Sequence, residues 1–241
     1  MKKKTISLII PAYNEEKYIG ECLDYAIRNS NGKFLEIIVV DNASTDKTAD
    51  IAGSFSGVKV IREDRKGLTR ARECGLKNSK GDILAYIDAD TRLPLNWVEQ
   101  IEKEFSKSEN LSCLSGPYIY HDISRLNKFL VKILYWYMLA MPVYKMVGYM
   151  VTGANFAIRR DVIEKMGGFD TTIEFYGEDT NVARRASKYG KVKFKPSFTM
   201  YLSGRRLNQQ GIYKTAFIYM ANYLSEVFLK KPSTKEYKDF R

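Results

Sequence analysis

Two aspartates separated by a single residue, Asp88 and Asp90, are the first residues in this sequence whose spacing suggests chemistry. They follow the apolar run 83–87, which has no helical spacing and therefore predicts a strand covered on both faces. Both carboxylates would then lie together at the strand's carboxyl end, where open α/β sheets bind ligands. Two such charges tolerate each other when a divalent cation lies between them and the phosphates of a ligand. The alternative is a solvated loop with two incidental aspartates.

Two further pairs of charged residues suit the same chemistry. Glu178 and Asp179 stand at the expected start of a helix, where anions are favoured, although an ordinary acidic first turn is the alternative. Arg205 and Arg206 lie in an expected loop at 203–206, and guanidinium groups suit bidentate contacts with phosphate. A solvated basic loop is the alternative there.

The elements that must position these residues begin with four strands that alternate with helices. This alternation predicts βαβ units, a mostly parallel sheet and right-handed crossovers. Three strands end in polar residues, near Pro11, Asp41 and Asp88, which we expect at one edge of the sheet. The expected strands are 5–11, 34–40, 58–62 and 83–87, and the expected helices are 15–29, one ending near 54, and 67–78.

The glycine patterns of other nucleotide sites are missing from the sequence. The turn after the first strand reads Pro11-Ala12-Tyr13-Asn14-Glu15 and not G-x-G-x-x-G, and G-x-x-x-x-G-K-[ST] occurs nowhere. A metal held by acidic residues is the natural substitute for a glycine-rich phosphate loop. Beyond residue 92 we expect a helix at 94–106, a strand within 111–120, a strand at 151–160, a helix at 161–167, strands near 192–195 and 198–201, and a last helix at 212–228.

Composition and charge describe a folded protein with a basic end. The chain has 241 residues, of which 45% are hydrophobic and 28% charged, with a net charge of +11. Residues 184–241 hold 14 Lys and Arg against 3 Asp and Glu, so the whole excess lies there. Such a region suits nucleic acid, an anionic membrane surface or phosphorylated substrates. Three scattered cysteines argue against a disulfide framework and fit a reducing compartment.

The segment 123–151 is rich in aromatic residues, leucine and methionine, and three lysines interrupt it. Its uncharged core, 133–144, has twelve residues, which is too few to span a bilayer. One interpretation is a helix packed on the domain. The other is an amphipathic segment that lies on a membrane interface or covers a lipid-linked acceptor.

Four motifs in order, Ser7–Glu16, Ile37–Asp46, Gly67–Arg72 and Asp88–Asp90, together resemble glycosyltransferase family 2. The resemblance implies the GT-A fold, an α/β fold with a Rossmann-like, mostly parallel central sheet flanked by helices, here followed by a smaller acceptor-side region and C-terminal helices. It also implies a single domain, with a nucleotide-binding half at 1–92, an acceptor-side half at 93–206 and a basic C-terminal helix and tail at 207–241. Glu73 departs from the pattern, because many relatives have Asn there.

The resemblance also implies roles for individual residues. Asp179 corresponds to the general base, and Asp88 and Asp90 to the contacts with Mg²⁺ or Mn²⁺. Gly153, Glu178, Arg205 and Arg206 are expected to contact the acceptor or the diphosphate. The residues expected to contact the nucleotide sugar are Pro11, Tyr13, Glu15, Asp41, Lys66, Arg72 and Asp88.

The function implied is a metal-dependent, inverting transfer of one sugar from a nucleoside-diphosphate sugar to an acceptor hydroxyl or phosphate. The absence of Q-x-x-R-W favours single-sugar transfer. The acceptor is expected to be a glycan or a lipid-linked molecule, and the protein to be cytoplasmic or peripheral at the inner face of the cell membrane. Alternatives are a nucleotidyltransferase acting on sugar phosphates, a non-catalytic module that binds membranes or nucleic acid, and a hydrolase.

Overall fold

The computed structural model describes residues 3–173, 175–231 and 233–234. A seven-stranded sheet with the order β3-β2-β1-β4-β8-β6-β9 runs through this part of the chain. Its first half is parallel, because β1 lies between β2 and β4 in the same direction. The elements of this half are β1 (Ile6–Ala12), α1 (Ile19–Ser30), β2 (Glu36–Asp41), α2 (Thr48–Gly53), β3 (Val58–Arg62), α3 (Leu68–Asn78) and β4 (Ile83–Ile87).

The second half of the sheet contains one reversed strand, because β8 is antiparallel to both β4 and β6. A small second sheet has the order β5-β10-β7 and extends from it. The mostly parallel sheet flanked by helices confirms the expected fold class. The elements of this half are β5 (Thr91–Arg92), α4 (Trp97–Lys107), β6 (Leu111–Ser115), β7 (Tyr118–Tyr120), β8 (Asn155–Arg159), α7 (Arg160–Lys165), α8 (Glu178–Ala186), β9 (Lys191–Phe194) and β10 (Met200–Leu202).

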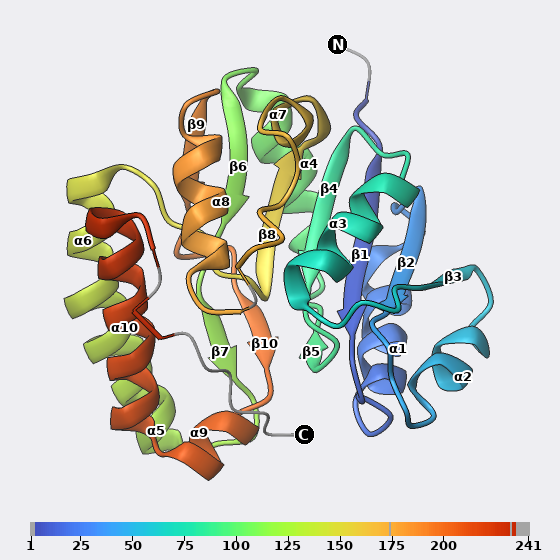
Figure 1. Ribbon diagram of the computed structural model, residues 1–241, viewed down its shortest axis with the longest axis horizontal. Helices are drawn as coiled ribbons and strands as arrows, with labels where there is room; N and C mark the ends of the chain where they lie inside the picture. Colours follow the sequence, from blue (N-terminus) through green and yellow to red (C-terminus); the bar gives the residue numbers. More distant parts are fainter. Residues whose placement is uncertain (1–2, 174, 232, 235–241) are drawn as a thin grey trace.

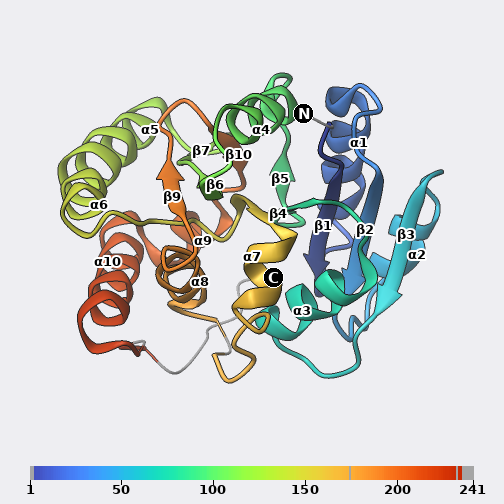
Figure 2. The ribbon, with the colours of Figure 1, turned by 90° about the horizontal axis from the view of Figure 1, so that it is seen from above.

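Two apolar cores cover the two faces of the large sheet. One contains buried residues of α1, α2 and α4, such as Leu23, Ala52 and Ile101. The other contains buried residues of α3, α7 and α8, such as Leu76 and Ile163. Figure 2 shows α1 and α4 on one side of the strands and α3, α7 and α8 on the other. Burial on both faces explains why the parallel strands read as continuous apolar runs.

A long helix lies beside the last helix at one end of the molecule. It consists of α5 (Arg125–Leu130), a π-helical segment η1 (Val131–Ala140) and α6 (Met141–Val147). Both ribbon views place it next to α10 (Ile212–Leu229), on the side away from α1–α3 (Figures 1 and 2). The helix packs on the domain through Trp136 and Ala140, which are buried.

By length and composition, the described part of the chain contains one helix that could cross a membrane, Arg125–Val147, which has 23 residues and contains an 18-residue stretch with a mean hydropathy of 1.2. The helix is longer than the twelve-residue uncharged core on which its sequence-based exclusion as a bilayer span rested. Core helices of soluble proteins meet the same criteria, but they are mostly buried. Here only 18% of the most apolar stretch is buried inside the protein, although Val131, Tyr135 and Tyr144 are partly buried against the core.

Five expected elements differ from the structure, and one of them is the helix expected at 94–106, which starts only at Trp97. The first helix starts at Ile19, because the backbone of residues 13–18 makes turns instead. The stretch 111–120 forms two strands, β6 and β7, interrupted at Gly116 and Pro117. The strand expected at 151–160 is confined to β8. Arg205 and Arg206 begin a short helix, α9 (Arg205–Gln210), where a loop was expected.

Candidate active site

The register of the parallel strands brings the first loop and the predicted aspartates to one sheet edge. Ala12 at the end of β1 is paired with Asp41 at the end of β2. On the other side of β1, Ile9 is paired with Tyr86 of β4, two residues before Asp88. Pro11 is buried at the end of β1. The edge predicted from the sequence is therefore formed as expected.

Hydrogen bonds hold the loop after β1 against the loop after β2. The backbone N–H of Asn14 donates to Ser44 Oγ at 3.0 Å, and Asn14 Oδ1 accepts from the N–H of Thr45 at 2.8 Å. Asn14 has a φ of 50°, a left-handed conformation that asparagine tolerates better than most residues. The N–H of Glu15 donates to Thr48 Oγ1 at 2.7 Å. These contacts fix the position of the Glu15 side chain relative to the sheet.

Tyr13 and Lys66, both expected beside the nucleotide, lie together although they come from different loops. Lys66 Nζ is 3.9 Å from the centre of the Tyr13 ring, which is a cation–π geometry. The loop that carries Lys66 is held by Asn42, whose Oδ1 accepts from the N–H of Gly67 at 2.7 Å. The Asn42 side-chain amide also donates to the carbonyls of Glu63 and Arg65.

Asp41 is buried at the end of β2, with 1% of its side chain exposed. Its Oδ2 accepts from Arg62 Nη1 at 2.7 Å, and its Oδ1 from the N–H of Ser44 at 3.3 Å. Arg62 is the strand partner of Asp41 on β3. The carboxylate is therefore held in place from two directions. Its contact with a nucleobase stays a prediction.

Arg205 joins two of the predicted donor-side carboxylates. Its Nη1 and Nη2 bind both carboxylate oxygens of Glu15, at 2.7 and 2.6 Å. Its Nε is 3.1 Å from Asp90 Oδ2. Burial raises the pKa of Asp90 to about 7, and the charges of Asp88 and Glu15 act in the same direction while Arg205 opposes them. The site thus concentrates negative charge for which one arginine compensates only in part.

Arg72 forms a second arginine–carboxylate pair, deeper in the protein. Its Nη1 donates to Glu178 Oε2, and its Nη2 donates to the carbonyl of Gly153 at 3.0 Å. Nη2 also lies 3.6 Å from Asp88 Oδ1. Arg72 is on α3 and Glu178 opens α8, so this pair links the two halves of the site. Burial raises the pKa of Glu178, while the positive charge of Arg72 opposes the shift.

Gly153 has a packing reason to be glycine. A Cβ atom at this position would lie 2.7 Å from Glu178 Oε1 and 2.9 Å from Arg72 Nη2. A side chain here would push the ion pair apart. The structure therefore places Gly153, expected to contact the acceptor or diphosphate, beside the pair and on the wall of the cavity described next.

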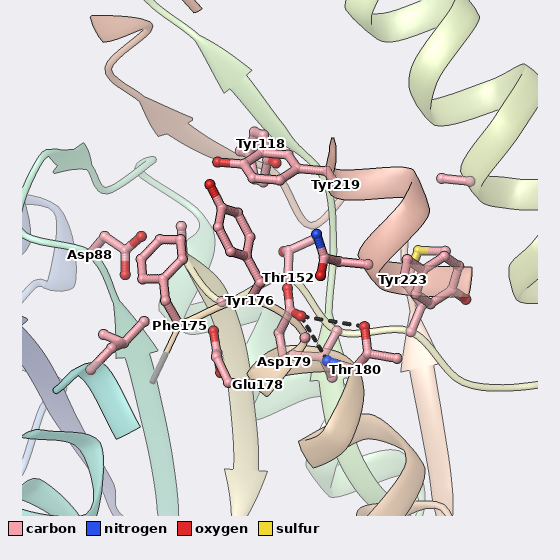
Figure 3. Close-up of a pocket in the computed structure, with 18 of the residues that line it drawn as sticks. Asp88, Tyr118, Thr152, Phe175, Tyr176, Glu178, Asp179, Thr180, Tyr219 and Tyr223 are labelled. Atoms are coloured by element: carbon pink, nitrogen blue, oxygen red, sulfur yellow. Dashed lines mark hydrogen bonds between the residues drawn. The ribbon is translucent and has the colours of Figure 1, made fainter. Parts of the chain in front are cut away.

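A cavity of about 140 Å³ lies between the two halves, and both Asp88 and Asp179 line it. Figure 3 shows Asp88 facing it from one side and Asp179 from the start of α8, with Tyr118, Tyr176 and Tyr219 around it. Aromatic walls with a few charged groups are typical of sites for small molecules. These tyrosines could not be predicted as neighbours, because they come from three distant segments of the chain.

Asp179 is partly exposed, whereas its neighbour Glu178 is buried. Asp179 Oδ1 accepts from the N–H of Thr180 at 2.7 Å and lies 3.4 Å from its hydroxyl (Figure 3). Burial raises the pKa of Asp179, while the Thr180 N–H and Arg72 partly counter this shift. A carboxylate with a raised pKa that faces a cavity is suited to accept a proton.

Arg206 lies at the aromatic side of the cavity. Its guanidinium is 4.8 Å from the centre of the Phe175 ring and 5.9 Å from that of Tyr219. Its Nη1 donates to the Tyr176 hydroxyl at 3.4 Å. Arg205 and Arg206 thus diverge from the first turn of α9, one toward the donor-side carboxylates and the other toward the aromatic wall.

Asp88 and Asp90 could hold a divalent cation whose remaining coordination positions are filled by a bound substrate and water. Among the residues that the structure describes, no group of three or more His, Cys, Asp or Glu could hold a metal by itself. Mg²⁺ and related cations are commonly held by one or two carboxylates together with substrate phosphates and water. Asp88, with 38% of its side chain exposed, and the charge-crowded Asp90 provide such a pair. Their role as ligands stays a prediction.

Sequence reasoning missed several residues that shape the site. Arg62 and Asn42 orient the nucleotide-side loops, and Glu73 accepts from the backbone N–H of Phe169 at 2.9 Å. This contact gives Glu73, the departure from the family pattern, a local structural role. Only the Arg62 contact could have been found from the sequence. Aligning the two expected parallel strands in register would have placed Arg62 beside Asp41.

Comparisons with known proteins agree with this geometry. The sequence profile described as "Glycosyl transferase family 2" matches residues 7–167. The probable glycosyltransferase YdaM of Bacillus subtilis is 30% identical over 207 residues, which are 80% of this chain and 49% of that protein. The glycosyltransferase GlyA of Streptococcus pneumoniae is 35% identical over 41% of this chain and 15% of its own length. The chain therefore spans about half, or less, of these relatives.

Solved structures show the same fold. The mannosyltransferase PcManGT from Pyrobaculum calidifontis, in complex with GDP-Man and Mn²⁺, has a TM-score of 0.71 at 21% identity, over 95% of this chain and 64% of its own. A glucosyl-3-phosphoglycerate synthase from Mycobacterium tuberculosis, in complex with Mn²⁺, UDP and phosphoglyceric acid, has a TM-score of 0.65 at 21% identity, over 93% of this chain and 79% of its own.

Proposed function

This chain belongs to glycosyltransferase family 2, and we propose that it transfers one sugar from a nucleoside-diphosphate sugar to an acceptor hydroxyl or phosphate, with inversion at the anomeric carbon. The observation that carries the proposal is the cavity between Asp88 and Asp179. It joins Asp88, one of the two carboxylates that suit a metal, on one side to Asp179, a carboxylate with a raised pKa, on the other. Structurally similar proteins bind GDP-Man or UDP together with Mn²⁺.

The donor half would hold the nucleotide and its diphosphate. The base and ribose would lie along Pro11, Tyr13, Asp41 and Lys66, at the edge formed by β1 and β2. Asp88 and Asp90 would hold Mg²⁺ or Mn²⁺, which when bound neutralises charge on the departing diphosphate. Arg205, from the first turn of α9, would turn from Glu15 and Asp90 to donate to the diphosphate oxygens.

The acceptor half would supply the base. Asp179 would take the proton of an acceptor hydroxyl as its oxygen attacks the anomeric carbon and the bond to the diphosphate breaks. If the acceptor is an ionised phosphate, its oxygen attacks without losing a proton. Glu178, held by Arg72, would fix the start of α8 and thereby the position of Asp179. A single displacement of this kind inverts the anomeric centre.

Replacing Asp179 with Asn tests the proposal. A general base typically contributes about 10²–10⁴-fold to the rate, so Asp179→Asn should lose at least roughly 10²-fold in transfer to a hydroxyl while nucleotide-sugar binding in Mn²⁺ persists. The assay measures nucleoside diphosphate, with pyrophosphate measured in parallel because a nucleotidyltransferase would release it. Near-normal turnover by this variant would contradict the assignment of Asp179.

We also propose that the protein is cytoplasmic and works peripherally at the inner face of the membrane. The exposed face of the helix Arg125–Val147, with large exposed side chains such as Leu126, Phe129 and Met138, supports this. So does the basic character of residues 184–241. Co-sedimentation with anionic vesicles should fall when Phe129 and Met138 are both changed to Ser. Equal binding by this variant would place the contact elsewhere.

A further inference from the structure

A second cavity, of about 370 Å³, lies between the long helix and the C-terminal helices. Residues of α5 and η1, such as Leu130 and Val131, form one wall, and residues of α9 and α10, such as Leu207 and Met220, form the other. The lining is predominantly aliphatic and aromatic. Sugars and nucleotides need hydrogen-bonding partners when they are buried, so this cavity suits hydrocarbon instead.

The apolar cavity adjoins the candidate active site. Tyr118, Tyr135 and Tyr219 line both this cavity and the one that contains Asp179. Figure 3 shows Tyr118 and Tyr219 at the border of the active-site cavity, above Asp179. The three aromatic residues therefore form a shared boundary. A molecule that crossed it would have one part in each cavity.

At its other end the apolar cavity reaches the surface. Tyr213, Phe217 and Leu139 line the cavity, yet they are 80%, 75% and 46% exposed. A group of exposed apolar side chains around the mouth of a cavity is typical of a site that binds an apolar ligand or a membrane. A hydrocarbon chain could therefore enter from the outer face of η1 and α10.

A positive charge lies beside the shared boundary. The Arg206 guanidinium is 5.9 Å from the centre of the Tyr219 ring, one of the three boundary residues. The cavity geometry and this charge together fit an amphipathic molecule with an apolar chain and an anionic head group. A neutral or zwitterionic head group would gain less from Arg206.

We propose that this cavity binds the hydrocarbon chain of a lipid-linked acceptor with an anionic head group, whose reactive oxygen then lies in the adjoining cavity that contains Asp179. This inference rests on the proposed glycosyl transfer, because that reaction decides which end of the acceptor lies in which of the two adjoining cavities. The chain leaves toward the surface that carries Tyr213 and Phe217, where a membrane would supply it.

The experiment uses dodecyl phosphate as the probe, below its micelle concentration, with binding measured by calorimetry on the whole protein. We expect binding with a negative heat-capacity change, the mark of apolar burial. Decyl phosphate should bind more weakly, by roughly fourfold for each missing CH₂. Inorganic phosphate, which lacks the chain, should give no measurable heat. Equal binding of inorganic and dodecyl phosphate would overturn the proposal.

A matched pair of variants locates the chain. Ala216 of α10 lines the apolar cavity, and Ala221, on the same helix, is not among the residues that line either cavity. Ala216→Phe should weaken dodecyl phosphate at least tenfold, whereas Ala221→Phe should bind it like the wild type. Leu139→Trp, at the exposed mouth of the cavity, gives a second test and should also weaken the binding of dodecyl phosphate. Unchanged affinity in Ala216→Phe and Leu139→Trp would overturn the proposal.

Two further measurements distinguish an acceptor site from a site for membrane lipid, and the failure of this proposal from the failure of the proposed function. Dodecylphosphocholine has the same chain and the head group of a bilayer lipid, and it should bind more weakly. If it binds as tightly as dodecyl phosphate, the cavity takes membrane lipid and the acceptor assignment is wrong. Nucleotide-sugar binding in Mn²⁺ is measured on the same variants. Loss of donor binding in every form, with chain binding intact, would contradict the proposed function and leave the cavity assignment standing.

Discussion

The site contains two arginine–carboxylate pairs that differ in burial and in the elements that carry them. Arg72 has 1% of its side chain exposed and joins α3 to Glu178 at the start of α8. Arg205 has 18% of its side chain exposed and reaches Glu15 and Asp90 from the first turn of the six-residue helix α9. Both are close to a carboxylate at the end of β4, Asp88 in one case and Asp90 in the other.

These differences in burial and in supporting elements indicate which of the two ion pairs a bound ligand can break. The Arg72–Glu178 pair borders the cavity but is itself buried between packed elements, so a ligand would have to break a buried ion pair to replace the guanidinium. The Arg205 pair lies on carboxylates that a divalent cation would also bind, and its helix is short. We therefore expect Arg72 to act on stability and on the position of Asp179, and Arg205 to act on the donor.

The largest expected effect is that of Arg72→Met. It leaves Glu178 buried without its partner, and breaking a buried pair in this way costs about 3–5 kcal/mol. Denaturant unfolding measures the loss. The double variant Arg72→Met/Glu178→Leu should recover much of it, because both charges are removed. If the single variant loses less than about 1 kcal/mol, the pair is not the link between the two halves that the geometry indicates.

Arg205→Gln should show an effect that Mn²⁺ reverses. Without the guanidinium, Glu15 and Asp90 repel each other, and a cation bound to Asp88 and Asp90 restores charge balance. Mn²⁺ should therefore raise the melting temperature of this variant more than that of the wild type, and it should not rescue Arg72→Met. Turnover should fall by roughly 10²-fold, because the diphosphate loses a counter-charge. If Mn²⁺ raises the melting temperature of the wild type, Arg205→Gln and Arg72→Met equally, the two arginines do not differ in the way proposed.

Gly153→Ala probes the buried pair from its neighbour. The added methyl lies within 3 Å of atoms of both Arg72 and Glu178, and overpacking of this kind costs about 1–3 kcal/mol. Gly53→Ala on α2 is the matched control, since its methyl would meet no atom within 4 Å. The control should be neutral or slightly stabilising. Equal melting temperatures for the two variants would show that the pair adjusts freely.

The smallest effect concerns pH. A base must be ionised, so kcat/KM for a hydroxyl acceptor falls as pH drops through the pKa of Asp179. Burial raises that pKa above its ordinary value of 3.8, so the fall should begin at a higher pH than for a solvated aspartate. Arg205→Gln should lower the plateau and leave this acid limb in place, because the groups that lower the pKa of Asp179 are Thr180 and Arg72 and not Arg205. A shifted limb in that variant would show that the two pairs are coupled.

Much of the fold was predictable because its signals are local. Apolar runs and the turns between them located β1 to β4, and the parallel arrangement placed Pro11, Asp41 and Asp88 at one edge. The start of α8 at Glu178 was predicted as well. Arg205 and Arg206 were expected in a loop, because a six-residue helix has too little periodicity to be recognised. The reversed direction of β8 was equally inaccessible, since strand direction depends on partners distant in sequence.

The family, the order of the strands along the chain and the identity of the charged residues at the site follow from the amino-acid sequence alone. They do so because strand period, turn residues and motif spacing are properties of neighbouring residues. The tertiary structure alone decided which arginine meets which carboxylate, since these pairs span 106 residues for Arg72–Glu178 and 190 for Arg205–Glu15. It also decided where the cavities lie. The D-x-D pair is visible in the sequence. The charges around Asp90 depend on the tertiary structure, which places Arg205 of α9 beside this carboxylate.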